Sequence, residues 1–122
     1  MVDFTRTALG LISAATVVVA TAPPAFAHAV LVRANPARDT TVAPIQRVQL
    51  EFSAHIETRF STVQVVSASG QTVVGESAVG SGNRTLTATL TRPLAPGAYR
   101  VEWRIVSADG HRMQGDYGFT VH

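Results

Sequence analysis

The sequence predicts an all-β domain, a Greek-key β-sandwich or barrel of about seven strands with an immunoglobulin-like arrangement. Three observations predict it: apolar and polar residues alternate in several short runs, turn-forming residues separate the runs, and no helical period follows residue 27. Any helix is expected to be at most one turn, near residues 57–60. The 95 residues after position 27 suffice for one compact domain but not for two.

Five runs alternate clearly enough to be assigned to strands, with their apolar members facing the core. Turn signals lie between and beside these runs, and Trp103 in the longest run is expected to anchor the core. The apolar members are Val48, Leu50 and Phe52; Val63 and Val65; Leu86, Ala88 and Leu90; Tyr99, Val101, Trp103 and Ile105; and Tyr117, Phe119 and Val121. The turn signals are Asn35-Pro36, Ala43-Pro44, Ser69-Gly70, Ser81-Gly82-Asn83, Pro93, Pro96-Gly97 and Asp109-Gly110.

Residues 1–27 have the features of a secretory signal peptide. Arg6 supplies a basic start, an apolar stretch covers residues 8–22, and Ala25-Phe26-Ala27 forms a small-x-small cleavage site. The apolar stretch is short for a transmembrane helix. We therefore expect cleavage after Ala27, a domain of residues 28–122 and a periplasmic or secreted product that begins with His28.

Composition excludes two classes of function. All ten basic residues are arginines, scattered singly among eight acids, so a nucleic-acid-binding surface is not expected. The chain has no cysteine, which removes the thiolate ligands of zinc fingers and blue-copper sites. A metal ion would have to be held by nitrogen and oxygen atoms.

Two segments carry residues suited to such a site. After cleavage, His28 would offer an α-amine and an imidazole to one metal ion. Asp109-Gly110-His111 is a strong hairpin signal, and this turn is a sufficient explanation for it. In extended geometry, residues two apart face the same side, so Asp109 and His111 are also candidates for a shared site. Both interpretations of the segment remain open at this point.

Residues 28–121 resemble the CopC family of periplasmic copper-binding, copper-resistance proteins. The most specific matching block runs from Pro96 to His111 and reads PGAYRVEWRIVSADGH. The other matching segments are His28-Ala29-Val30-Leu31-Val32 with Asn35-Pro36, residues 48–53, residues 60–63, residues 94–95 and residues 115–121.

The resemblance implies a β-sandwich that binds one Cu(II) ion per chain near its surface. It assigns the ligands as the N-terminal histidine and the Asp-x-His turn, which are His28, Asp109 and His111 here. Cu(II) prefers tetragonal sets of nitrogen and oxygen donors. The expected role is non-enzymatic: a monomer that sequesters copper, confers resistance or delivers copper to a separate CopD-type membrane transporter.

The sequence departs from the family pattern at two places. The stretch of residues 67–75, where some members carry a methionine-rich Cu(I) site, has no methionine, so no Cu(I) site is expected. Ala54 occupies a position that is often glutamate in the family. We do not assign His55 or Glu57 as ligands, and we expect the terminal His122 to be frayed.

Two other functions are weighed. An N-terminal histidine with a second histidine also resembles the copper brace of oxidative polysaccharide enzymes, but no aromatic face for a polymer is evident. An adhesive immunoglobulin-like module would use Asp109-Gly110 only as a turn. Copper binding that depends on His28 and His111 would exclude this module.

Overall fold

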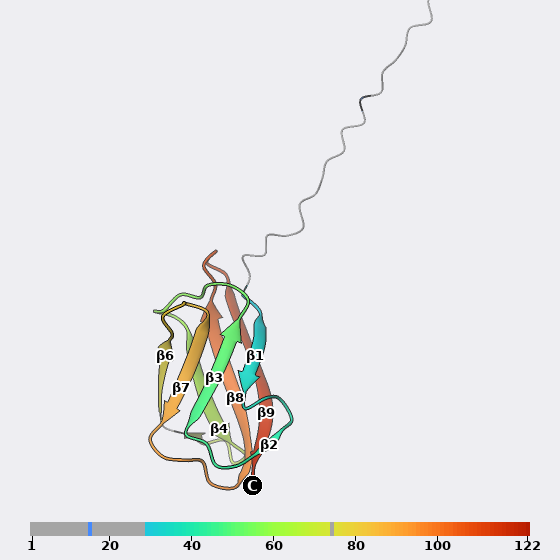
Figure 1. Ribbon diagram of the computed structural model, residues 1–122, viewed down its shortest axis with the longest axis vertical. Helices are drawn as coiled ribbons and strands as arrows, with labels where there is room; N and C mark the ends of the chain where they lie inside the picture. Colours follow the sequence, from blue (N-terminus) through green and yellow to red (C-terminus); the bar gives the residue numbers. More distant parts are fainter. Residues whose placement is uncertain (1–14, 16–28, 74) are drawn as a thin grey trace, which may run out of the picture.

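The computed structural model describes residue 15 and residues 29–73 and 75–122. The expected signal peptide, apart from residue 15, and the candidate ligand His28 lie outside the described residues. The described chain forms two packed β-sheets and contains no helix (Figure 1), which confirms the predicted all-β class. No helix within these residues has the length and hydropathy of a membrane span.

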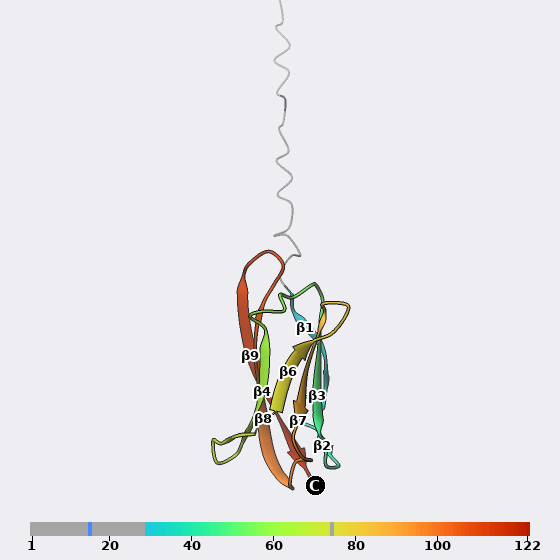
Figure 2. The same ribbon diagram turned by 90° about the vertical axis from the view of Figure 1, so that its left-hand side faces the viewer.

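The strands divide into a four-stranded and a five-stranded sheet, seen as two layers in Figure 2. In the first sheet the order is β1 (Leu31–Asn35), β3 (Arg47–Phe52), β7 (Thr85–Leu90) and β6 (Gly75–Val79). In the second it is β2 (Thr41–Val42), β9 (Arg112–Val121), β8 (Gly97–Val106), β4 (Thr62–Ser67) and β5 (Thr72–Val73). Pairs are antiparallel except β2 with β9. Seven of these strands have five or more residues, as the sequence predicts.

The core lies between the sheets and consists of the apolar residues of the alternating runs. Val48, Leu50 and Phe52 on β3 are almost completely buried, while Gln49 between them is exposed. Trp103 on β8 is 9% exposed, and its ring meets that of Phe52 edge-on with centroids 5.3 Å apart. Trp103 therefore anchors the core, as predicted, and joins the two sheets.

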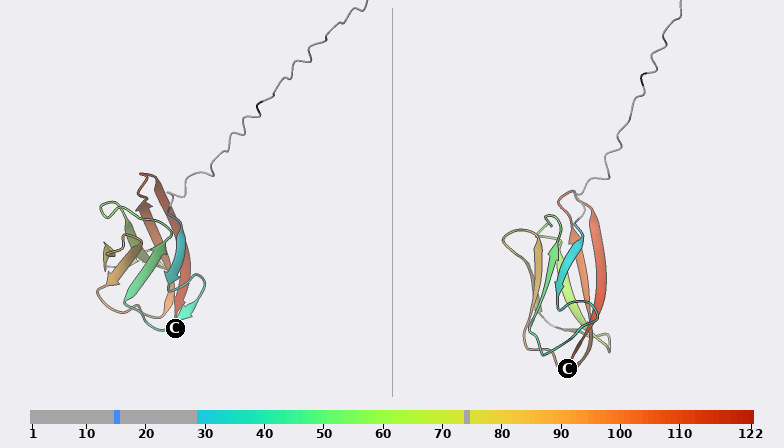
Figure 3. Two further views of the ribbon diagram at one scale, coloured as in Figure 1. Left: turned by 45° about the horizontal axis from the view of Figure 1, so that its top comes forward. Right: turned by 45° about the vertical axis from the view of Figure 1, so that its right-hand side comes forward.

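Several loops gather at one end of the sandwich, opposite the C-terminus. The two views in Figure 3 place the β8–β9 hairpin, the β3–β4 connection and the start of β1 at this end. Any helix was expected to be at most one turn near residues 57–60 of the β3–β4 connection. Residues 58–60 form a turn that is not helical. Within the connection, the Ile56 amide donates to the Asn83 carbonyl at 2.7 Å, which ties it to the β6–β7 turn.

Candidate metal centre

The β8–β9 hairpin carries two of the candidate ligands. Its last strand pair is Val106 with Arg112, and residues 107–111 connect the strands. Gly110 has φ +87°, a conformation that glycine adopts easily. This confirms the predicted turn at Asp109-Gly110. Extended geometry was the wrong reason to pair Asp109 with His111, because the chain reverses direction between β8 and β9.

The turn nevertheless brings the two side chains together. His111 Nδ1 lies 2.8 Å from Asp109 Oδ2, and the His111 amide donates to Asp109 Oδ1 at 3.1 Å. The Asp109 side chain is 20% exposed and that of His111 is 65% exposed. The pair is thus accessible from solvent while its geometry is fixed by the turn.

Ser107 is fully buried and contacts this pair from the core side. Its hydroxyl donates to Asp109 Oδ1 and lies 3.2 Å from the His111 carbonyl oxygen. The Ser107 amide donates to the same carbonyl at 2.9 Å. One buried serine therefore contacts both the candidate oxygen ligand and the backbone of the candidate nitrogen ligand.

These hydrogen bonds favour the ionised form of Asp109. The Ser107 hydroxyl is the largest contributor, and the amide and imidazole of His111 add to it, so the pKa of Asp109 lies well below its usual range. A carboxylate offers about four lone-pair sites. Hydrogen bonding and metal ligation by Asp109 are therefore compatible.

The β3–β4 connection lies directly beside the hairpin. The Ala108 amide donates to the His55 carbonyl at 3.0 Å, and the Glu57 amide donates to the Val106 carbonyl at 2.7 Å. Ile56 forms an isolated antiparallel bridge with Ser107. These bonds hold the β8 end of the turn against a second segment.

The same connection holds the start of the described chain. The Val30 amide donates to Ser53 Oγ at 3.0 Å, and the Ser53 amide donates to the Val30 carbonyl at 2.8 Å. Ala29 is fully buried in the core. Residues 53–57 thus connect Val30, two residues after His28, with the hairpin that carries Asp109 and His111.

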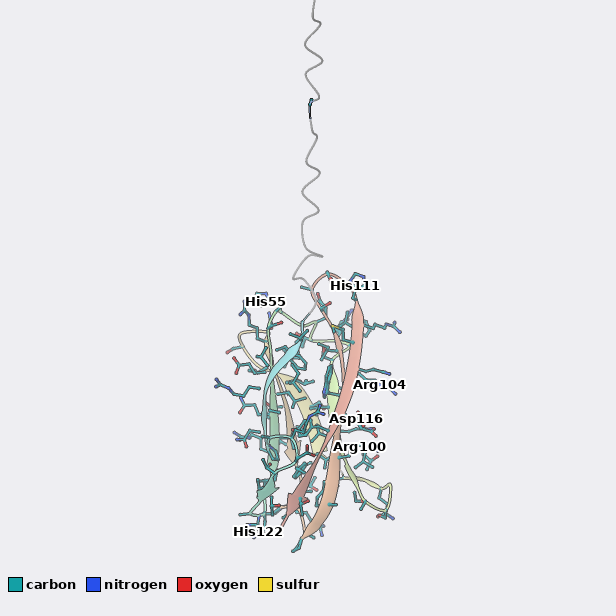
Figure 4. The ribbon with its side chains drawn as sticks, turned by 90° about the vertical axis from the view of Figure 1, so that its right-hand side faces the viewer. His55, Arg100, Arg104, His111, Asp116 and His122 are labelled. Carbon is teal, nitrogen blue, oxygen red and sulfur yellow. The ribbon has the colours of Figure 1, made fainter. Side chains whose placement is uncertain are left out.

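The other histidines differ in position. Figure 4 shows His55 at the same end of the sandwich as His111, and His122 at the opposite end. Within residues 29–73 and 75–122, no three histidine or acidic side chains form a group that could hold a metal ion. Asp109 and His111 therefore need a further donor, and His122 is too far along the sandwich to supply it.

Sequence reasoning missed Ser107 and the contact between residues 55–57 and the hairpin. A signal for Ser107 exists in the sequence. Val101, Trp103 and Ile105 face the core from β8, and Ser107 is the next residue in that register. A hydroxyl at a position that faces the core is expected to be buried and to form hydrogen bonds there. No comparable signal marks residues 55–57, because their contacts are tertiary.

Comparison with known proteins shows the family to which this chain belongs. The family model of the CopC domain matches residues 31–122. Copper resistance protein C of Escherichia coli is 34% identical over 105 residues, covering 80% of this chain and 83% of that protein. The chain therefore belongs to the CopC family, as its resemblance implied.

The relatives also include a much longer transport protein and proteins of solved structure. Copper transport protein CutJ of Bacillus subtilis is 33% identical over 100 residues, which cover 79% of this chain but 18% of CutJ. Among solved structures, CopC from Methylosinus trichosporium OB3b is similar with a TM-score of 0.72 and 34% identity, covering 77% of this chain and 93% of that one. PcoC, a methionine-rich copper resistance protein from Escherichia coli, matches with a TM-score of 0.72 and 33% identity, covering 78% and 99%. Copper resistance protein C and PcoC are named for copper resistance, and CutJ for copper transport.

Proposed function

We propose that this protein is exported, cleaved after Ala27 and binds one Cu(II) ion through His28, Asp109 and His111. Its role is to sequester copper or to deliver it to a separate CopD-type membrane transporter, without catalysis and as a monomer. The compartment is the periplasm or the cell exterior. Membership of a copper resistance and transport family supports the copper cargo.

One observation carries the assignment of the site. The chain that follows His28 is anchored at Val30 to Ser53, and the segment after Ser53 is bonded to the hairpin that brings Asp109 and His111 together. An N-terminal amine and imidazole near that hairpin would add two nitrogens to one nitrogen and one oxygen. Such a tetragonal set suits Cu(II).

The proposal includes no Cu(I) site of the methionine type. The chain has two methionines, Met1 and Met113, and only Met113 follows the expected cleavage point. This composition contrasts with that of PcoC, the methionine-rich copper resistance protein. Soft thioether ligands are what Cu(I) prefers.

Titration of the processed protein with Cu(II) tests the proposal. We expect one bound ion, and His28→Ala and His111→Ala should each weaken binding by more than about 100-fold, because each removes a direct ligand. His55→Ala and His122→Ala are the matched controls and should bind as the unaltered protein does. Copper binding that survives in His111→Ala, or that is lost in His122→Ala, would contradict the proposed ligand set.

A further inference from the structure

The outer face of the five-stranded sheet is divided into two halves that differ in charge balance. Toward the C-terminal end of the sandwich, Arg100 pairs with Glu102 at 2.9 Å and lies 3.7 Å from Asp116. The pKa of Glu102 is lowered first by a hydrogen bond from Gln64 and then by Arg100. This half of the face is electrostatically satisfied by its own residues.

The half nearer the hairpin is different. Arg59, Arg104 and Arg112 are exposed there, and among the described residues no acidic side chain forms an ion pair with any of them. Arg104 is the smallest of the influences on the pKa of Glu102, which it helps to lower. Figure 4 shows Arg104 between His111 and the Arg100–Asp116 pair along this face. As far as the described residues go, these three guanidinium groups are available to a ligand.

These arginines line a concavity of about 510 Å³, together with the polar Thr62 and Gln114 and several apolar residues. Its lining includes Phe60, Val106 and Met113, and no acidic residue is among the lining residues that the structure describes. Phe60 is 66% exposed, more than Val30 or Val32, which are the other large hydrophobic residues exposed in the described chain. Aromatic residues, methionine and arginine are the types enriched in protein interfaces.

We propose that this surface, the arginine face of Arg59, Phe60, Arg104 and Arg112, is a docking site for an acidic protein segment with an apolar side chain. Carboxylates would pair with the guanidinium groups, for which bidentate geometry is favourable, and the apolar side chain would enter the concavity beside Phe60. Arg112 directly follows His111, so the docked segment would lie next to the candidate metal centre. That such a partner exchanges copper with this chain rests on the proposed function.

Two other occupants fit less well. A flat anionic membrane contacts protruding residues, whereas this surface is hollowed. A second copy of the chain offers the neighbouring acids Glu102 and Asp116, but both already contact Arg100. Charge complementarity therefore favours a partner with clustered carboxylates.

The test uses the metal-free processed protein and a blocked five-residue peptide with one leucine between two pairs of glutamates. In amide chemical-shift mapping by NMR at low salt, we expect changes near residues 59–62, 104–106 and 112–114. Binding should weaken as salt is added. The corresponding lysine peptide and vesicles of phosphatidylglycerol should not bind at this face.

Matched variants make the test specific. Replacing Arg59, Arg104 and Arg112 together with glutamine should weaken peptide binding about tenfold, and Phe60→Ser should weaken binding of the leucine peptide but not of its glycine analogue. The control replaces the exposed Arg38, Arg47 and Arg92, which lie toward the C-terminal end of the sandwich, together with glutamine. This variant should change the affinity for the peptide by less than about twofold. All these residues are exposed, so the variants should remain folded.

Three results would overturn the proposal: equal loss in both triple variants, no peptide binding, or vesicle binding through the arginine face in place of peptide binding. Because no copper is present, a failure here leaves the metal-site proposal intact. Equally, a protein that binds the peptide but not Cu(II) would refute the metal site alone.

Discussion

Ser107 shows how a single buried residue can shape a surface site. Its hydroxyl and amide contact Asp109 Oδ1 and the His111 carbonyl from inside the sandwich. A buried hydroxyl is favourable only when it is hydrogen-bonded. In the proposed site, Ser107 would therefore position the two candidate ligands for the metal ion.

Replacing Ser107 with alanine should weaken Cu(II) binding about 10–100-fold, which is the usual effect of losing a group that orients a ligand. Ser61→Ala is the matched control, because Ser61 is also buried and its hydroxyl accepts a hydrogen bond from the Val106 amide. Titration of both variants with Cu(II), with unfolding monitored separately, checks this. Equal affinities in the two variants would show that Ser107 has only a structural role.

At the scale of the element, the pairing of β8 with β9 depends on a small residue opposite a large one. Trp103 is registered with Gly115, and a Cβ atom at Gly115 would lie 2.4 Å from Cζ2 of the indole. The indole occupies the space that a side chain at Gly115 would need. Because Trp103 also contacts Phe52 on β3, this local fit affects the contact between the sheets.

Gly115→Ala should therefore lower the free energy of unfolding by about 1–3 kcal/mol, the usual cost of overpacking a core. Gly118→Ala on the same strand is the control, since its nearest neighbour would be the Tyr99 carbonyl oxygen at an ordinary 3.7 Å. Denaturant unfolding of both variants measures the difference. The packing account fails if Gly115→Ala is as stable as Gly118→Ala.

The strands that sequence could predict are those buried on one face. β3, β4, β7, β8 and β9 alternate in sequence because they alternate in burial over most of their length. β6 and β1 are edge strands whose residues are mostly exposed, so the core imposes no alternation on them. The neighbouring strand determines how each edge strand pairs, and the local sequence pattern of the edge strand does not predict this pairing.

For the molecule as a whole, the candidate centre depends on three segments that are far apart in sequence. The hairpin could be predicted locally, because Asp109-Gly110 is a turn signal. The hydrogen bonds between Ser53 and Val30 and between His55 and Ala108 could not be predicted locally. They depend on how the two sheets pack. The family resemblance supplied the grouping of His28 with the hairpin, and local sequence patterns alone left it open.

Burial of Tyr117 makes the stability of the whole fold sensitive to alkaline pH. Its hydroxyl donates to the Pro36 carbonyl at 2.7 Å, and burial raises the pKa of Tyr117 to about 12. An unfolded tyrosine titrates near ~10, so the folded state retains the proton longer. The contribution is fully present below about pH 10 and is lost as the pH rises toward about 12.

Between about pH 10 and about pH 12, the free energy of unfolding of the wild-type protein should therefore fall more steeply than that of Tyr117→Phe. The extra loss should be up to about 2 kcal/mol over this range. Near neutral pH the variant should be less stable by about 1 kcal/mol, because it loses the hydrogen bond to Pro36. Urea unfolding at several pH values measures both effects. Parallel pH profiles for the two proteins would refute the assignment to Tyr117.

The most direct measurement of the central claim is electron paramagnetic resonance of the processed protein with one equivalent of Cu(II), compared with the same protein acetylated at the His28 α-amine. Acetylation removes one nitrogen donor, whereas an added residue would bring a new amine of its own. We predict a nitrogen-rich type 2 spectrum that changes on acetylation, together with a loss of affinity. Identical spectra and affinities for the two forms would contradict a copper site built on the N-terminus.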